Sequence, residues 1–188
     1  MMMSFQEIKN KFWLLFFLSV LLSNNNVNAQ TSYTSKEIKV NIFSSTPLED
    51  IKAQALNVVS VIIPKSKQLV FQIPIKSFVF SRSLMQEHFN ESYMESDKYP
   101  ISSFKGNIIE NIDFKKDGIY NVNVKGILTM HGIPKERQIK GVIMIKDGKP
   151  SINTTFNVAC ADHDIKIPSI VFKKIAEVIS VTVSGNYQ

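Results

Sequence analysis

Three histidines are the side chains of this sequence that could bind a metal ion or transfer protons. His88 lies among apolar residues, His131 precedes a glycine, and His163 stands between two aspartates. A metal site on a helix brings two histidines together at positions i and i+4, or it uses a closely spaced ligand pair. No pair of these histidines has such spacing, so the sequence favours structural roles. A metal-dependent envelope enzyme that uses His88 and His131 is the alternative, and it requires the fold to bring them together.

Several carboxylates surround His88, and paired carboxylates can perform acid–base chemistry. Glu87, Glu91 and Glu95 follow at intervals of four and share one helix face, which is typical of a solvated surface. Cys160 is the only cysteine, so no internal disulfide can form and a buried thiol is the expected role. The sequence has no Gly-rich phosphate loop and no nucleophile-elbow motif. We therefore predict no catalytic residues, no metal site and no cofactor.

The segment around His88 has apolar residues at helical spacing. Leu84, Met85, His88, Phe89 and Tyr93 fall on one face of a helix over about residues 82–94, in a chain whose other segments mostly alternate. A single helix among strands indicates a sheet that is closed around an interior, with the helix covering one opening.

The alternating segments predict about eight strands in up-and-down order. They cover approximately residues 37–42, 58–63, 69–80, 104–114, 120–130, 137–145, 152–158 and 179–183. Pro74 cannot donate to a strand ladder, and the inward positions change parity after it, which indicates a bulge or bend. Asp117-Gly118 and Asp147-Gly148 predict tight hairpins. Eight antiparallel strands suit a closed barrel, and a two-sheet sandwich is the second choice.

The first 29 residues have the pattern of a secretory signal peptide. Lys9 and Lys11 precede an apolar run over residues 12–22, and a polar stretch then leads to Ala29. The apolar run is too short to span a bilayer, which needs roughly 20 residues. We expect cleavage after Ala29, a single domain over residues 30–188 and a periplasmic or secreted location without an integral membrane anchor.

The charge pattern says little about partners. The net charge of +6 is spread along the chain, and no cluster of basic and aromatic residues suggests a nucleic-acid interface. We predict no nucleic-acid partner. The oligomeric state is left open, a homodimer included.

Three groups of residues, taken in order, resemble the YceI-like family of polyisoprenoid-binding, lipocalin-like barrels. The first group runs from Phe78-x-Phe80 through residues 84–94 to Tyr99-Pro100 and Phe104-x-Gly106, the second is residues 126–132 followed by Lys135, and the third is Asp162 with residues 165–168. The family usually carries an aromatic residue after Asp162, where this chain has His163.

The resemblance implies an all-β, eight-stranded antiparallel barrel with a helical insert that caps one end, and an apolar tunnel for the tail of an isoprenoid lipid. We therefore predict a bacterial, non-enzymatic binding protein for an isoprenoid, quinone-like or other amphiphilic lipid. A ligand-free structural or stress-response protein, whose barrel is filled by its own side chains, is a further alternative. The predicted ligand-binding residues are Phe78, Phe80, Leu84, Met85, His88, Phe89, Tyr93, Phe104, Val124 and Leu128.

Overall fold

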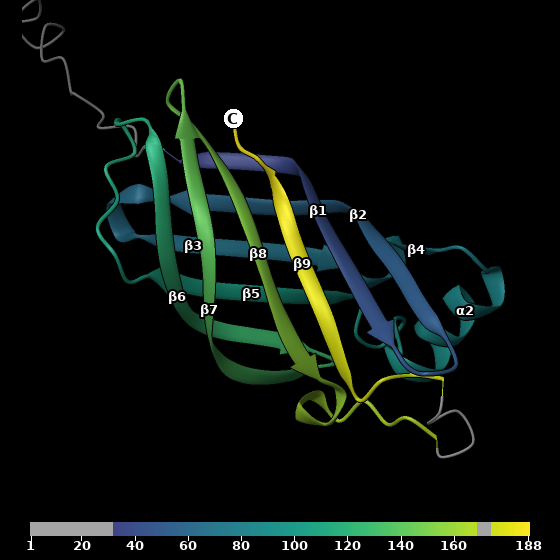
Figure 1. Ribbon diagram of the computed structural model, residues 1–188. Coiled ribbons are helices and arrows are strands. Elements are labelled where there is room, and N and C mark those ends of the chain that lie inside the picture. Colours follow the sequence, from purple (N-terminus) through teal and green to yellow (C-terminus); the bar gives the residue numbers. More distant parts are fainter. Residues whose placement is uncertain (1–31, 169–173) are drawn as a thin grey trace, which may run out of the picture. The chain divides into compact units, whose positions relative to one another are not determined.

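The computed structural model describes residues 32–168 and 174–188, so the predicted signal peptide lies outside the described part of the chain. Nine strands form one antiparallel sheet (Figure 1). They are β1 (Tyr33–Ser45), β2 (Asp50–Ile63), β3 (Gln68–Pro74), β4 (Phe78–Phe80), β5 (Ile101–Ile108), β6 (Gly118–Met130), β7 (Ile133–Lys146), β8 (Lys149–Ala159) and β9 (Val178–Asn186).

Eight of these strands close into a barrel, because β1 pairs with both β2 and β9. Around the barrel the order is β1, β9, β8, β7, β6, β5, β3 and β2, and β4 pairs only with β2. Closure leaves the eight strands without a free edge, and the alternating residues then face either the interior or solvent. The predicted barrel is confirmed, and the two-sheet sandwich is wrong.

The bend predicted at Pro74 separates β3 from β4. β2 pairs with β3 through residues 59–63 and with β4 through residues 53–55. Between the two short strands lies one turn of 3-10 helix, η2 (Ile75–Ser77). The buried residues shift from odd positions, ending at Ile75, to even positions, beginning at Phe78. The change of parity read from the sequence is therefore the point where one strand breaks in two.

The helical insert lies between β4 and β5. It consists of a short α-helix, α2 (Ser83–His88), which continues directly into a turn of π-helix, η3 (Phe89–Tyr93). Two further 3-10 segments are η1 (Pro64–Ser66), which joins β2 to β3, and η4 (Cys160–His163), which follows β8. Among the described residues, no helix has the length and apolar content needed to cross a membrane.

Two turn predictions have different outcomes. Asp147-Gly148 joins β7 to β8 with positive φ angles of 51° and 69°, as a tight hairpin requires. The hairpin predicted at Asp117-Gly118 is wrong, because β5 ends at Ile108 and a longer loop leads to β6. The Asp117 carboxylate instead accepts hydrogen bonds from the backbone N–H groups of Asp147 and Gly148, at 2.9 and 3.3 Å.

Two strand predictions also change. β2 begins at Asp50, eight residues before the predicted start at residue 58. The strand predicted over residues 104–114 ends at Ile108, and the apolar alternation beyond it belongs to the loop. Phe114 in that loop is buried and stacks on Tyr33, with ring centroids 5.6 Å apart. Its apolar character reflects packing over the end of the barrel.

The end of the barrel that carries the C-terminus is filled by side chains. Ile62 and Tyr187 are fully buried there, and the backbone N–H of Tyr187 donates to the Pro150 carbonyl at 2.8 Å. The hydroxyls of Tyr187 and Ser60 lie 2.5 Å apart, and Ser60 Oγ also donates to the Val70 carbonyl at 2.9 Å. Burial raises the pKa of the Tyr187 phenol. We call this region the packed end.

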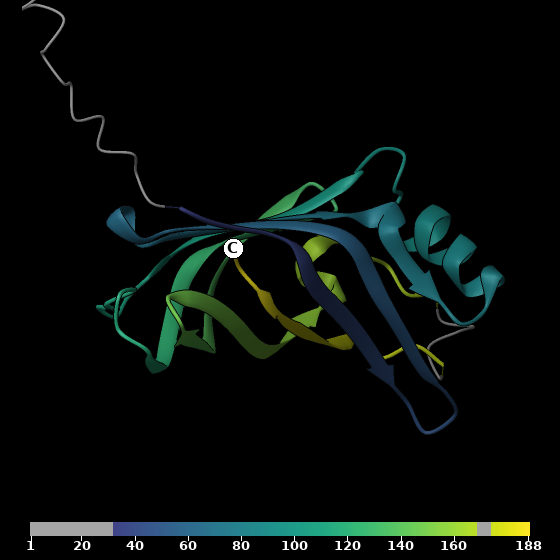
Figure 2. The same cartoon turned by 90° about the horizontal axis from the view of Figure 1, so that it is seen from above.

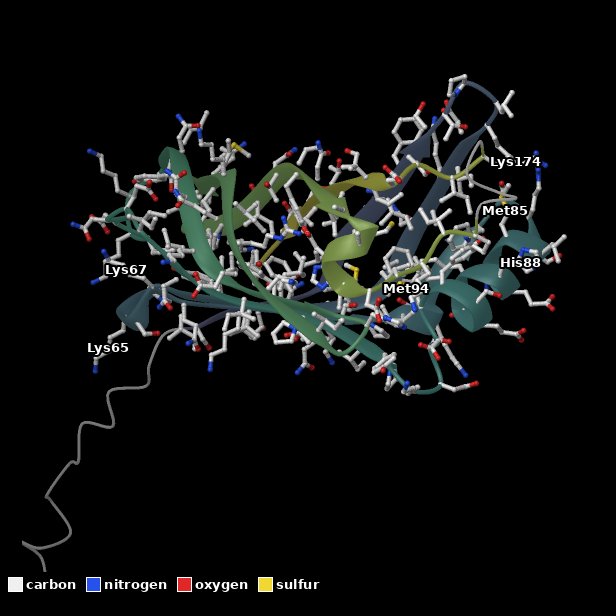
Figure 3. The ribbon with its side chains drawn as sticks, turned by 90° about the horizontal axis from the view of Figure 1, so that it is seen from below. Lys65, Lys67, Met85, His88, Met94 and Lys174 are labelled. Carbon is white, nitrogen blue, oxygen red and sulfur yellow. The ribbon has the colours of Figure 1, made fainter. Side chains whose placement is uncertain are left out.

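The helical insert lies at the other end of the barrel, beside the β1–β2 hairpin (Figure 2). Figure 3 shows Met85, His88 and Lys174 at this end, and Lys65 and Lys67 of the η1 region at the packed end. An ion pair of 2.8 Å between Arg82 Nη1 and Glu49 Oε1 ties α2 to the β1–β2 turn. We call this region the helical end.

Candidate functional site

A cavity of about 460 Å³ occupies the barrel interior at the helical end. This volume is within the range of about 300–1,000 Å³ that is typical of small-molecule sites. Inward-facing residues of the strands form its walls, and α2 and η3 contribute residues at its mouth. Most lining side chains are apolar, as a site for a hydrocarbon chain requires. The fully buried residues Ile62 and Tyr187 of the packed end are not part of the lining.

All ten residues predicted from the sequence to bind ligand line this one cavity. They come from four elements far apart in the chain: β4, the helical insert, β5 and β6. Phe104, Val124 and Leu128 are buried in the wall, whereas Leu84 and His88 are exposed at the mouth. Their common location is an observation, and their role in binding stays a prediction.

The helical insert covers the cavity without burying a side chain of its own in the core. Neither α2 nor η3 contains a fully buried residue, although the apolar spacing is typical of a helix packed on a core. Phe89 holds the insert in place, with its ring centroid 5.2 Å from that of Phe78 and 5.0 Å from that of Phe80. Gln86 Oε1 also accepts a hydrogen bond from the Phe80 backbone at 3.3 Å. The insert is therefore attached to β4 and lies over the cavity.

The π-helical turn continues the helix over the cavity. Its i→i+5 bond joins the Met94 N–H to the Phe89 carbonyl at 2.9 Å. π-helical turns are rare and frequently mark functional sites. Tyr93 and Met94 follow one another at the end of this turn, and both line the cavity. Burial raises the pKa of the Tyr93 phenol.

Two facing glycines let β5 and β6 approach closely beside the cavity. Gly106 pairs with Gly126, and a Cβ added at Gly126 would lie 2.4 Å from the Gly106 Cα. A Cβ at Gly106 would lie 2.9 Å from the Phe104 ring. The missing side chains therefore leave room for the ring of Phe104, which forms part of the cavity wall.

Polar and charged side chains of the lining belong mainly to segments around the mouth. Glu49 comes from the β1–β2 turn, Arg82 and His88 from the helical insert, and Lys174 from the segment before β9. Ser44 Oγ accepts a hydrogen bond from the Ala176 backbone at 2.8 Å, which ties that last segment to β1. The arrangement is an apolar chamber below a polar mouth, which is complementary to an amphiphile.

His131 and His163 form a structural network. His131 Nε2 lies 2.7 Å from Glu95 Oε2, and its Nδ1 lies 3.1 Å from the His163 carbonyl. The Tyr99 ring meets the imidazole of His131 edge-on at 4.5 Å. His163 Nδ1 contacts the Ile133 carbonyl at 3.0 Å. These contacts join the β6–β7 hairpin, η4 and the segment before β5, and they include Tyr99 of the first group and His131 of the second group that carry the family resemblance.

The conformation of the β6–β7 hairpin fits this structural role. His131 and Gly132 have φ angles of 52° and 75°, and the Cβ that Gly132 lacks would lie 2.6 Å from the Tyr99 ring. Burial is the main cause that lowers the pKa of His163, whose side chain is fully buried. His163 Nε2 is buried and has no hydrogen-bond partner within the described part of the chain.

The structure does not assemble the histidines into a metal centre. His131 Nε2 contacts Glu95 and His131 Nδ1 contacts the His163 carbonyl, whereas His88 is exposed at the cavity mouth. Within residues 32–168 and 174–188, no group of three or more His, Cys, Asp or Glu side chains could hold a metal ion. Cys160 is buried as predicted, and burial raises the pKa of its thiol.

Sequence reasoning missed several residues of the cavity. Phe71, Ile73 and Ile75 lie at alternate positions of the strand predicted over residues 69–80, and they line the cavity. Ser102 and Cys160 also belong to the lining. The position of Ser102 could have been found from the sequence, because it precedes Phe104 by two residues and therefore shares its face of β5.

Comparisons with known proteins agree with this architecture. The model of the YceI-like domain family matches residues 24–187. No curated protein sequence matches the chain. A solved structure described as a polyisoprenoid binding domain from Saccharophagus degradans, implicated in plant cell wall breakdown, has a TM-score of 0.72 at 11% identity. The alignment covers 84% of this chain and 97% of that one.

Two further solved structures share the fold. BcnA of Burkholderia cenocepacia has a TM-score of 0.64 at 11% identity, with 80% of this chain and 96% of that chain covered. The YCEI protein of Campylobacter jejuni has a TM-score of 0.57 at 20% identity, with 71% and 82% covered. At these identities the likeness is one of fold.

Proposed function

The chain belongs to the YceI-like domain family, and we propose that it is an exported, non-enzymatic binding protein for an amphiphilic isoprenoid or quinone-like lipid. The observation that carries this proposal is the apolar cavity of about 460 Å³ beneath the helical insert. The description of the Saccharophagus degradans domain as polyisoprenoid-binding supports the choice of ligand class.

The physical basis of binding is the removal of a hydrocarbon tail from water. Each Å² of apolar surface that is buried contributes about 25 cal/mol. Ile73, Phe104 and Val124 belong to a wall that offers such a tail contacts without requiring directional bonds. Met85 and Met94 also line the cavity, and methionine adapts to a flexible chain because its side chain is unbranched and polarizable.

The orientation of the bound lipid follows from the two ends of the cavity. A charged head group lies at the mouth, near Arg82, His88 and Lys174, and the tail extends toward the packed end. Arg82 already pairs with Glu49, so a head group at the mouth meets a cation whose charge is partly compensated. Phe89 holds the insert that covers this lipid, through its contacts with Phe78 and Phe80.

Lipid analysis of the protein from its native host tests the proposal. We expect extraction and mass spectrometry to find an isoprenoid lipid in stoichiometric amounts. Val124→Phe, which adds a ring inside the cavity, should abolish copurification. Ile127→Phe is the matched control, because Ile127 lies on the same strand and is exposed to solvent. The absence of any bound hydrophobe, together with no uptake of an isoprenoid probe, would contradict lipid binding.

Export is the second part of the proposal, and the pattern of residues 1–29 supports it. The apolar run over residues 12–22 follows two lysines and precedes Ala29, as in a cleaved secretory signal. N-terminal sequencing of the protein from the periplasm or culture medium should find Gln30 first. A protein that keeps its first 29 residues and stays in the cytoplasm would contradict export.

The enzyme alternative makes a different prediction. A metal-dependent enzyme should contain stoichiometric zinc or iron that is lost when His88 or His131 is replaced. Since His131 contacts Glu95 and the His163 carbonyl, we expect His131→Ala to lower stability without changing metal content. Metal analysis of the purified protein distinguishes the two functions.

A further inference from the structure

Ser102 carries the one buried hydroxyl that lines the cavity wall without a partner among the residues that the structure describes. Its side chain is 3% exposed, and its Oγ has no hydrogen-bond partner. A buried polar atom that makes no hydrogen bond lowers the stability of the folded state, because it has lost its bonds to water without replacing them. Buried polar groups in folded proteins are therefore nearly always satisfied. The exception at Ser102 calls for a partner that the described residues do not supply.

The hydroxyl faces the cavity because of its position in β5. Ile101, Lys105 and Asn107 are exposed, whereas Ser102, Phe104 and the further even positions are buried. Ser102 pairs with Ile73 of β3, and Phe104 pairs with Phe71 one inward position deeper. Ile73, Phe71 and Phe104 line the same cavity as Ser102. Ser102 is thus a single hydroxyl on an otherwise apolar part of the wall.

Other buried serines of the barrel show that the chain can satisfy such groups. Ser60 Oγ contacts the Tyr187 hydroxyl and the Val70 carbonyl, at 2.5 and 2.9 Å. Ser44 Oγ accepts a bond from the Ala176 backbone at 2.8 Å, and Ser35 Oγ accepts one from the Glu37 backbone at 3.1 Å. Each of these three hydroxyls has a partner from the chain, whereas Ser102 Oγ has none among the residues that the structure describes.

We propose that Ser102 Oγ donates a hydrogen bond to an uncharged oxygen of the bound lipid, such as a ring carbonyl of a prenylated quinone. This inference rests on the proposed lipid-binding function and adds a specificity-determining residue to it. A carbonyl satisfies the hydroxyl and needs no counter-ion. A prenylated ring also provides the apolar surface that matches the surrounding wall.

A phosphate fits this position poorly. The inward-facing neighbours of Ser102 on β3 and β5 are Ile73, Phe71 and Phe104, and none of them can neutralise an anion. Burying an ionised group without a paired charge carries a large desolvation cost. The cations that line the cavity, Arg82 and Lys174, belong to the segments of the mouth. A charged head group would therefore stay at the mouth, away from Ser102.

The test compares three lipids that carry the same isoprenoid tail: a prenylated benzoquinone, the prenylated benzene without oxygen, and the prenyl phosphate. Equilibrium binding with radiolabelled lipids gives the Kd of each. We expect Ser102→Ala to raise the Kd of the quinone by about threefold to tenfold, the range that corresponds to one neutral hydrogen bond. The Kd of the other two lipids should change less than twofold. Ser102→Thr keeps a hydroxyl and should restore most of the affinity for the quinone.

Ser103→Ala is the matched control, because Ser103 is the next residue of β5 and points to the opposite face. It should leave all three Kd values unchanged. An equal loss for the quinone and the hydrocarbon in Ser102→Ala would overturn the inference and indicate a packing effect. A loss confined to the phosphate would overturn the choice of an uncharged oxygen. If the wild-type protein binds none of the three lipids, the proposed lipid-binding function fails together with this inference. If it binds them and Ser102→Ala changes no Kd, only this inference fails.

Discussion

At the packed end of the barrel, Ile62, Ser60 and Tyr187 are buried and the two hydroxyls bond to each other. At the helical end, Ile73 and Ser102 occupy equivalent inward positions but face a cavity of about 460 Å³. Both ends therefore use isoleucine and serine on the same barrel. The difference shows that residue type does not distinguish a side chain that completes the core from one that lines a cavity. The neighbouring residues in the folded barrel decide which of the two roles a side chain has.

The largest expected difference between the two ends concerns truncation of isoleucine. Ile62→Ala should lower the free energy of unfolding by about 2–5 kcal/mol, because it opens a hole in close-packed surroundings. Ile73→Ala removes the same atoms from a wall that already faces a void, so its cost should be smaller. Urea unfolding of both ligand-free variants measures the difference. Equal destabilisation would show that the helical end is as closely packed as the other.

Serine truncation should separate the ends in the same direction. Ser60→Ala leaves the buried Tyr187 hydroxyl without its 2.5 Å partner, and we expect a loss of about 1–3 kcal/mol in the free energy of unfolding. Ser102→Ala removes a hydroxyl that has no partner among the residues described by the structure, so the ligand-free protein should keep or gain stability. Thermal unfolding of the two variants provides the measurement. A clear destabilisation by Ser102→Ala would mean that its hydroxyl is satisfied within the protein.

The buried histidine predicts a dependence of stability on pH. Because burial lowers the pKa of His163, the unfolded chain binds a proton more readily than the folded one. The free energy of unfolding should therefore fall as the pH drops below about 6.5, the ordinary pKa of histidine, with a slope from this group of at most about 1.4 kcal/mol per pH unit. This contribution to the decrease in the free energy of unfolding should end once the pH lies below the pKa of His163 in the folded protein.

Urea unfolding at pH 7.5 and pH 5.0 measures this dependence. His163→Phe places a non-titrating aromatic residue at the same position, and its stability should change less between the two pH values than that of the wild type. The difference between the two proteins isolates His163 from the other groups that titrate in this range. An identical pH dependence would assign the effect to those other groups.

Ligand retention should depend more on the helical insert than on the barrel wall. Phe89→Ala removes the ring that contacts Phe78 and Phe80, and we expect bound lipid to dissociate about tenfold faster, equivalent to about 1.4 kcal/mol. Ile143→Ala truncates a buried residue of the wall and should mainly lower stability. Dissociation of a radiolabelled lipid measures both variants. Equal rates would show that the insert does not control release.

The smallest expected effect is a local change in hydrogen exchange. The helical insert over residues 83–93 has no fully buried side chain, so its amides should exchange sooner than those of β6. Bound lipid should slow exchange in the insert selectively, because the ligand stabilises the closed form. Exchange measured by mass spectrometry, with and without lipid, tests this. Equal protection in both elements, unchanged by lipid, would leave the insert a packing role only.

The sequence alone determined the strand content, the position of the helix and the parity of most inward residues. The strand assignments rested on the alternation of apolar and polar residues, as in β6, where Val122, Val124 and Leu128 are all buried. Pro74 marked the break between β3 and β4 because proline cannot donate to a ladder. These features depend on local geometry, which neighbouring residues in the chain specify. Strand parity and the helical spacing of residues 84–93 together placed the ten predicted residues along one cavity.

Tertiary structure alone decided which inward residues meet a neighbour and which meet a void. Phe114 alternates like a strand residue, yet it lies in a loop and stacks on Tyr33 from the start of β1. Asp117-Gly118 resembles a hairpin turn, yet the Asp117 carboxylate binds the turn between β7 and β8. Ser60 Oγ contacts the Tyr187 hydroxyl and the Val70 carbonyl, whereas Ser102 Oγ has no partner among the described residues. Such contacts join residues far apart in the chain, and only the folded barrel brings these residues together.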